Sequence, residues 1–165
     1  MIDLAIKFSP ATATDEPLID KLDERAFGPG RYARTAYRLR EGVPADLSLS
    51  FVARIGTLLI GANRMTPILV GMSPALLLGP LTVEPAFRSQ GVGEALVKHS
   101  LDAAREHGHG LVLLVGDADY YMRMGFERVP RGKITMPGPV DPARLLYHEL
   151  RPGALDAASG MMRRA

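Results

Sequence analysis

The sequence contains no cysteine, which excludes a disulfide framework and a zinc site built from thiolates. A chain of 165 residues is long enough to bury a core without such support. The lack of cysteine fits a reducing compartment, so we expect a cytoplasmic protein. His107 and His109 stand two residues apart in a glycine-bracketed turn without an acidic partner at ligand spacing, and we expect no metal site.

Long apolar runs are missing as well. The chain begins with alternating apolar and polar residues, whereas a secretory signal needs an unbroken apolar stretch after a basic start. The longest apolar run, residues 75–81, is interrupted by Gly79 and Pro80. It is far shorter than the roughly 20 residues that span a bilayer. The sequence therefore predicts no membrane partner.

The formal net charge is only +2, which is too small to predict a nucleic-acid partner. Within this balance, four arginines gather on one segment that is predicted to be helical: Arg31, Arg34, Arg38 and Arg40. Two interpretations are open. The arginines form a solvated helix face, or they form an anion-attracting rim beside a binding site, suited to an acidic acceptor or to the phosphates of a cofactor.

Apolar periodicity and chain breakers predict an α/β fold. The predicted strands are residues 3–8, 48–55, 57–65, 68–70, 75–83, 111–115, 126–129 and 145–150. The predicted helices are residues 14–27, 32–41, 91–107 and 118–124. This order indicates a mixed sheet with helices on its faces, in one domain over residues 1–165 whose tail frays after about residue 152.

The most informative stretch is the one in which the strand at 75–83 leads into the helix at 91–107. The first N–H groups of a helix have no internal partners and carry a positive partial charge. Gly91 and Gly93 let an anion approach this backbone, and Arg88 adds a side-chain charge. The stretch is therefore a phosphate cradle. It is not a dinucleotide fingerprint, since position 96 is Leu96, and it lacks the Gly-Lys-Ser/Thr of a P-loop.

The remaining pattern, Arg-x-x-Gly-x-Gly from Arg88 to Gly93, resembles the pyrophosphate-binding motif of the GNAT N-acetyltransferases. Residues 120–126, Tyr-Tyr-Met-Arg-Met-Gly-Phe, resemble the Tyr-x-x-x-Gly-Phe signature that closes the acyl-CoA site of this superfamily. Segments 78–83 and 114–121 are also similar to the YhbS-like group of predicted acetyltransferases. The strong resemblance covers about residues 75–130.

The resemblance implies a GNAT fold, with a mostly antiparallel twisted sheet of about six to seven strands and about four helices. The sheet would be splayed next to the strand that ends at Val83. The implied enzyme is an N-acetyltransferase, for acyl groups other than amino-acyl. It would move the acetyl group of acetyl-CoA directly to a primary amine of a small molecule or a protein. A homodimer is expected by the same analogy.

The resemblance also implies roles for individual residues. The break at Gly79-Pro80 would let the end of the strand splay and free its backbone groups for the pantetheine amides. Tyr121 would be the general acid that protonates the leaving thiolate; the alternative is a packed tyrosine whose hydroxyl caps a carbonyl. Arg123 would meet a CoA phosphate or stay solvated. The implied acyl-CoA-binding residues are Leu81, Thr82, Val83, Arg88, Ser89, Gln90, Gly91, Val92, Gly93, Glu94, Tyr121 and Arg123.

The sequence gives the least support for the general base that would deprotonate the acceptor amine. Some family members carry a glutamate on the strand that leads into the CoA-binding loop, but residues 75–78 contain no carboxylate. Glu84, at the far end of that strand, is a candidate base or a cap of the loop, and His148 is a second candidate. The missing carboxylate leaves a different function open, a non-catalytic acyl-CoA-binding or regulatory module of the same fold.

Overall fold

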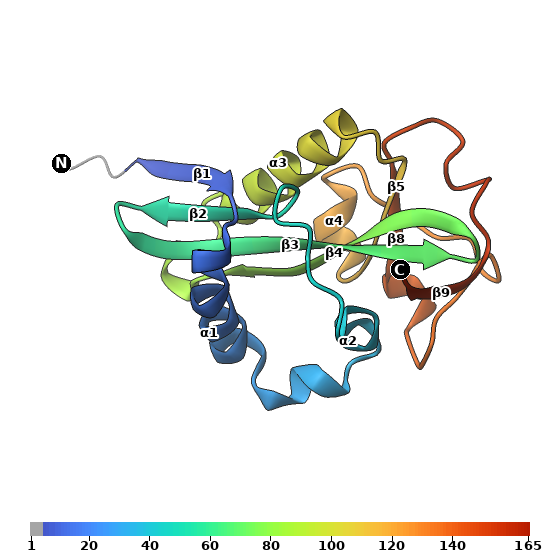
Figure 1. Cartoon of the computed structure of the whole chain (residues 1–165), viewed down its shortest axis with the longest axis horizontal. Coiled ribbons are helices and arrows are strands. Elements are labelled where there is room, and N and C mark those ends of the chain that lie inside the picture. The colour runs from blue at the N-terminus through green and yellow to red at the C-terminus, as the bar shows by residue number, and fades with distance from the viewer. Residues whose placement is uncertain (1–4) are drawn as a thin grey trace.

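Nine strands and four helices make up the described part of the chain, residues 5–165 of the computed structural model (Figure 1). The strands are β1 (Ile6–Pro10), β2 (Phe51–Ile55), β3 (Leu58–Val70), β4 (Ser73–Val83), β5 (Leu111–Val115), β6 (Glu127–Arg128), β7 (Ile134–Thr135), β8 (Leu145–Glu149) and β9 (Gly160–Arg164). The helices are α1 (Glu16–Phe27), α2 (Thr35–Arg40), α3 (Val92–Glu106) and α4 (Ala118–Met122). Within residues 5–165, no helix combines the length and the apolar character that a membrane crossing requires.

The strands form one mixed sheet in the order β1-β2-β3-β4-β5-β8-β6, and β9 joins it by pairing with β3 and β7. The β4–β5 and β7–β9 pairs are parallel, and the other pairs are antiparallel. The predicted mixed sheet is confirmed. Its strand count is higher than the predicted six to seven, because β7 and β9 lie in segments that the sequence pattern did not assign to strands. Of the first predicted strand, residues 3 and 4 lie outside the described residues, and β1 continues to Pro10.

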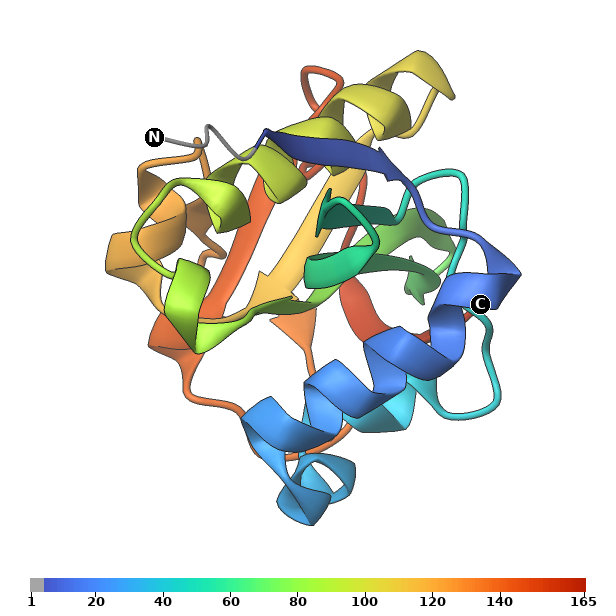
Figure 2. The same cartoon turned by 90° about the vertical axis from the view of Figure 1, so that its left-hand side faces the viewer.

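Helices cover both faces of the sheet. α3 packs on β2, β3 and β4, and α1 packs on β3 and β4 from the opposite side (Figure 2). The alternation of a strand explains this arrangement. Leu76 and Leu78 join the core that includes Val97 of α3, whereas Leu77 joins the core that includes Leu39 of α2. All five side chains are buried, and each contributes roughly 2 kcal/mol of apolar transfer free energy.

β3 is one continuous strand, which corrects the prediction of separate strands at 57–65 and 68–70. The break was expected at Pro67, because proline cannot donate a ladder hydrogen bond. On the edge away from β4, however, β2 pairs with β3 only as far as Asn63, and β9 begins to pair at Ile68. Pro67 lies in the gap between these two partners, where no strand of residues 5–165 pairs with this edge of β3.

β4 contains a bulge at Gly79-Pro80, where the sequence predicts a break. Between the pairs Asn63–Leu81 and Met65–Leu78, β4 advances by one residue more than β3, which is the definition of a bulge. Its other edge pairs with β5 only at Leu76–Val112 and Leu77–Leu113. Beyond Leu77 the two parallel strands separate, so the predicted splay next to the strand ending at Val83 is confirmed.

α2 is shorter than the predicted helix at 32–41. A 3-10 helix occupies Pro29–Ala33, and Arg34 then adopts an extended conformation with φ −72° and ψ 142°. Regular α-helix begins only at Thr35, whose hydroxyl donates a 2.7 Å hydrogen bond to the Pro139 carbonyl. The break at Arg34 turns the segment, so the four arginines do not lie along one continuous helix.

The C-terminal tail is folded, which corrects the prediction that it frays after about residue 152. β9 pairs with β3 over Ile68–Val70, and Met162 in this strand is fully buried. Leu155 and Ala158 are buried ahead of it and belong to the same core cluster. The tail closes the sheet edge and the core beneath it. The pairing of β9 with β3 joins segments far apart in the sequence. The short β9 segment, which contains glycine and arginine, has no sequence pattern of its own that predicts a strand.

Candidate active site

The start of α3 is joined to the end of β4 by a short loop, as predicted for the phosphate cradle. Gly91 precedes the helix with φ 80°, a left-handed conformation that glycine adopts at low cost. Gly93 is so close to its surroundings that a Cβ there would lie 2.4 Å from the Tyr120 hydroxyl oxygen. Arg88 and Gln90 are exposed on the loop. The free N–H groups and the dipole of this 15-residue helix suit an anion such as a pyrophosphate.

Two consecutive tyrosines on α4 line the cavity at the separated strands and make different contacts. The Tyr120 hydroxyl lies against Gly93 of α3. Tyr121 packs edge-to-face on Phe126, with ring centroids 5.9 Å apart, and lines a cavity next to the separated strands. Within residues 5–165 its hydroxyl makes no hydrogen bond, so it does not cap a carbonyl. Burial, with a smaller contribution from Tyr120, raises the pKa of Tyr121, which keeps the hydroxyl protonated at neutral pH.

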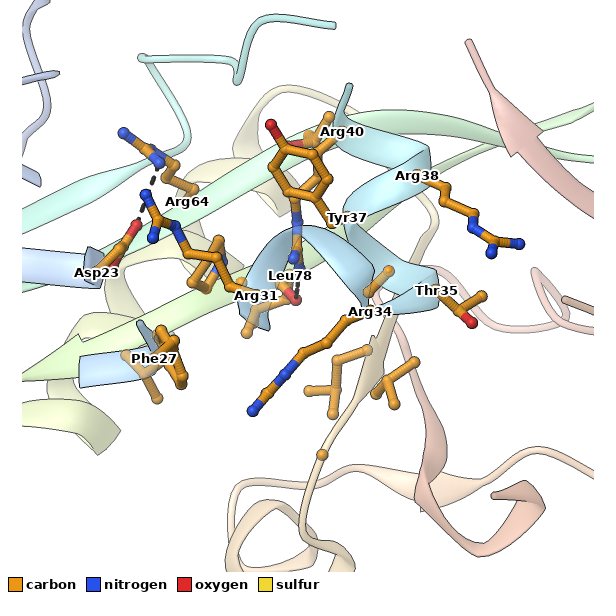
Figure 3. Close-up of a pocket in the computed structure, with 18 of the residues that line it drawn as sticks. Asp23, Phe27, Arg31, Arg34, Thr35, Tyr37, Arg38, Arg40, Arg64 and Leu78 are labelled. Atoms are coloured by element: carbon orange, nitrogen blue, oxygen red, sulfur yellow. Dashed lines mark hydrogen bonds and ion pairs between the residues drawn. The ribbon is translucent and has the colours of Figure 1, made fainter. Parts of the chain in front are cut away.

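The cavity has a volume of about 1320 Å³ and lies on the α1 and α2 side of the sheet. Its inner end is formed where β4 and β5 separate, by residues 78–81 and 114–116. α1 supplies one wall and the segment 31–40 another. All four arginines of the cluster line the cavity, which favours the rim interpretation over a plain solvated face. Figure 3 shows Arg31 extending towards Asp23 and Arg64, whereas Arg38 points away from them.

A model of the acetyltransferase (GNAT) domain family matches residues 46–128, just over half of the chain. This chain belongs to the GNAT acetyltransferase family. The matched region begins before β2 and ends in β6. It therefore contains the phosphate cradle, the separation of β4 and β5, and both tyrosines of α4, but neither α1 nor α2.

Similarity to individual GNAT proteins extends over most of the chain. The uncharacterized N-acetyltransferase YhbS of Escherichia coli K12 is 30% identical over 150 residues, which cover 90% of this chain and 89% of YhbS. A crystal structure of Escherichia coli YhbS in complex with CoA superposes with a TM-score of 0.84 at 27% identity, covering 100% of this chain and 92% of that one. A Brucella melitensis GNAT acetyltransferase in complex with acetyl-CoA has a TM-score of 0.64 at 27% identity, covering 88% and 97%. These matches confirm the predicted GNAT fold.

The residues expected to pair with pantetheine lie on the free edge of β4. Leu81, Thr82 and Val83 pair with β3 on one side, and no β5 partner faces them on the other within the described residues. Leu81 also lines the cavity. The Val83 carbonyl accepts a 3.2 Å hydrogen bond from Arg88 Nε, and the edge offers its other backbone groups in the opening, as expected for this family.

Glu84 does not lie at the cavity. Its carboxylate forms an ion pair with Arg25, and its backbone N–H donates to the Ile60 carbonyl at 2.8 Å. Glu84 is not among the residues that line the cavity. His148, the other candidate base, has its Nδ1 2.9 Å from the Gly125 carbonyl oxygen and stacks beside Phe126, away from the cavity lining. Neither side chain is therefore among the residues that line the cavity.

Arg123 directly follows α4, is exposed, and approaches Glu94 in the first turn of α3. Its Nη2 is 3.7 Å from the Glu94 carboxylate, and its guanidinium stands 5.4 Å from the centre of the Tyr120 ring. The side chain is 64% exposed, so this ion pair is weak. Arg123 is close enough to the cradle to meet an anion there.

Arg40 lines the cavity, and the sequence did not reveal that its guanidinium is buried there. Its Nη2 is 3.5 Å from the Leu78 carbonyl oxygen, at the point where the strands separate (Figure 3). Its Nε is buried and has no hydrogen-bond partner in the described chain. Burial lowers the pKa of Arg40 to about 10, so the group remains a cation at neutral pH. The sequence placed Arg40 in a cluster but could not separate it from the other three arginines.

Asp23 is the second residue that the sequence analysis missed. It is 3% exposed, accepts a 2.7 Å hydrogen bond from the Thr82 hydroxyl of β4, and contacts Arg64 at 3.2 Å. Burial raises the pKa of this carboxyl, and the bonds from Thr82 and Arg64 oppose that effect. The available signal was its helical position four residues after the buried Ile19, because a carboxylate on an apolar face needs a partner.

Proposed function

We propose that this protein transfers the acetyl group of acetyl-CoA directly to a primary amine within a ternary complex. The observation that carries the proposal is one opening with two different sides. The free edge of β4 begins at the cavity, which Leu81 and Tyr121 line, and Tyr120, which also lines the cavity, reaches Gly93 at the start of α3. CoA in the YhbS structure and acetyl-CoA in the Brucella melitensis structure support the same donor here.

The residues of the cradle suit the donor. Acetyl-CoA supplies an acetyl thioester. The N–H groups from Gln90 to Glu94 would hold its pyrophosphate, with Arg88 and Arg123 adding positive charge. The free edge of β4 would hydrogen-bond the pantetheine amides.

Tyr121 is proposed as the proton donor. The neutral amine bonds through its nitrogen to the carbonyl carbon and gives up a proton to solvent water, the bond from that carbon to sulfur breaks, and the sulfur leaves as a thiolate. The Tyr121 hydroxyl donates its proton to this sulfur, and the resulting phenolate takes up a proton from solvent. One observation supports the role: the hydroxyl is free of other hydrogen bonds within residues 5–165. Burial raises the pKa of Tyr121, so the hydroxyl carries its proton at neutral pH and is a weaker acid than a solvated tyrosine.

The first experiment is isothermal titration of acetyl-CoA into the purified protein, followed by turnover of a panel of primary amines. We expect micromolar binding and release of free CoA that depends on an added amine. Binding without any amine-dependent turnover would favour the alternative, an acyl-CoA-binding or regulatory module. Absence of binding at millimolar acetyl-CoA, with folded protein, would reject both functions.

A further inference from the structure

Five arginines around the cavity have no carboxylate within 4.0 Å anywhere in residues 5–165. They come from two segments, 31–40 and 139–144, and they are Arg31, Arg34, Arg38, Arg40 and Arg144. The cations meet other groups instead. Arg31 stacks 4.2 Å from the centre of the Tyr32 ring, and Arg38 donates to the Pro137 carbonyl. Several uncompensated cations at one cavity produce a positive potential that attracts an anion.

Arg40 is the innermost of these cations. Its contact of 3.5 Å with the Leu78 carbonyl is longer than a good N–H···O bond of about 2.9 Å, and its Nε has no partner in the described chain. A buried donor without a partner costs free energy that a ligand can recover. A guanidinium offers two parallel N–H groups, which match a carboxylate or a phosphate-type group.

The opposite wall of the cavity has the opposite charge. Four carboxylates of α1 line it, and Arg64 of β3 pairs with two of them, Asp20 and Asp23. The other two carboxylates are Glu16 and Glu24, and the wall also contains Lys21. A primary amine arrives as a cation, so this wall attracts it, whereas the arginine wall attracts an acid group. A compact molecule that carries both groups complements both walls.

We propose that the acceptor is a small amine that also bears a carboxylate or a phosphate-type acid, and that Arg40 binds this acid beside the reacting nitrogen. This inference rests on the proposed acetyl transfer. The position of Arg40 at Leu78, where β4 and β5 separate, favours a small molecule over a protein. Both the acid and the amine must reach the inner end of the cavity together.

The first test compares matched acceptors at saturating acetyl-CoA: glycine, β-alanine and 4-aminobutyrate, their amides, and their phosphonate analogues. We expect the acids to have kcat/KM values at least about tenfold above those of the amides, about 1.4 kcal/mol. The chain length that works best reports the spacing of amine and acid. The comparison of the carboxylates with their phosphonate analogues shows which acid group the site prefers. Amides acetylated as well as the acids, in a protein that binds acetyl-CoA, would overturn this inference and leave the proposed transfer intact.

The second test does not depend on turnover. Inorganic phosphate is titrated into the protein saturated with CoA, which occupies the cradle at α3. We expect millimolar binding to the wild type and at least about tenfold weaker binding to Arg40→Met. Arg40→Lys keeps the positive charge but loses the two parallel N–H groups of the guanidinium. It should therefore weaken phosphate binding several-fold, and it serves as the test if the methionine variant does not fold.

Arg105→Met is the matched control, because Arg105 is exposed, pairs with Asp102 and lies outside the cavity. It should bind phosphate like the wild type. Phosphate binding that is absent from the wild type, or equal in wild type and both Arg40 variants, would overturn the role of Arg40. Loss of acetyl-CoA binding in the wild type would instead reject the proposed function itself.

Discussion

The two sides of the opening between β4 and β5 are built from different kinds of groups. On the α3 side, the groups are mainly backbone N–H and C=O groups from one continuous stretch, residues 81–94. On the α1 and α2 side, they are charged side chains from segments that are far apart in sequence: α1, residues 31–40, Arg64 of β3 and residues 139–144. A backbone cradle is set by the path of the chain and tolerates changes of side chain. A cavity lined by side chains changes its preference with each substitution. A family that keeps one donor but varies its acceptor needs both: a backbone side for the donor and a side-chain side for the acceptor.

Tyr121 lies between the two sides, and its removal should have the largest effect. Tyr121→Phe should lower kcat on the order of 10²-fold, because a positioned general acid contributes about that much. The affinity for acetyl-CoA should stay within about twofold, since the hydroxyl acts when the thiolate leaves. Steady-state kinetics and calorimetry measure the two quantities. Tyr147→Phe is the control, because its hydroxyl bonds Glu127 outside the cavity. An unchanged kcat for Tyr121→Phe would reject the role.

Acetyl-CoA binding at the cradle should weaken when a negative charge is placed beside its backbone N–H groups. Gly91→Glu should weaken acetyl-CoA binding at least about 100-fold, near 2.7 kcal/mol, because a carboxylate would stand beside the phosphates. Gly91→Gln brings the same strain at φ 80° without the charge and should cost about tenfold. Calorimetry with acetyl-CoA measures both. Equal losses would mean that strain, rather than phosphate binding at this helix start, causes the effect.

The acceptor side should be the more sensitive to loss of a buried side chain. Asp23→Ala leaves the Thr82 hydroxyl and one contact of Arg64 without a partner, and should lower the free energy of unfolding by about 2–3 kcal/mol. Asp20→Ala removes the other partner of Arg64, but Asp20 is 66% exposed and should cost less than about 1 kcal/mol. Urea unfolding compares the two. Similar losses would show that burial of Asp23 is not what matters.

The smallest effect is expected at Glu84. Because its carboxylate pairs with Arg25 and does not line the cavity, Glu84→Gln should keep kcat/KM within about threefold at pH 7 to 9. Arg25→Gln, which breaks the same pair from the other side, should behave alike. A loss of more than about tenfold in Glu84→Gln alone would return this residue to the role of the base.

The elements of the proposed cofactor site could be predicted from sequence because their signals are local. Gly91, Gly93 and the helix that follows them are adjacent in the chain, and Gly79-Pro80 marks the bulge within a single strand. The continuity of β3 and the strand β9 could not be predicted in this way. Both depend on which strand lies along an edge: Pro67 is tolerated because no strand pairs beside it, and the tail is ordered because β3 offers an edge to it.

By itself the sequence determined the mixed sheet, the glycine-containing start of α3 that is proposed as the phosphate cradle, and the tyrosine motif, since each is a short pattern whose geometry follows from backbone preferences. It also gathered the arginines but could not say what they face. Only the tertiary structure decided that Arg40 reaches Leu78 at the separated strands, that Asp23 is buried against Thr82, and that Glu84 is turned to Arg25. The reason is physical: the pairing and burial of a charge depend on neighbours that the chain brings close only when it folds.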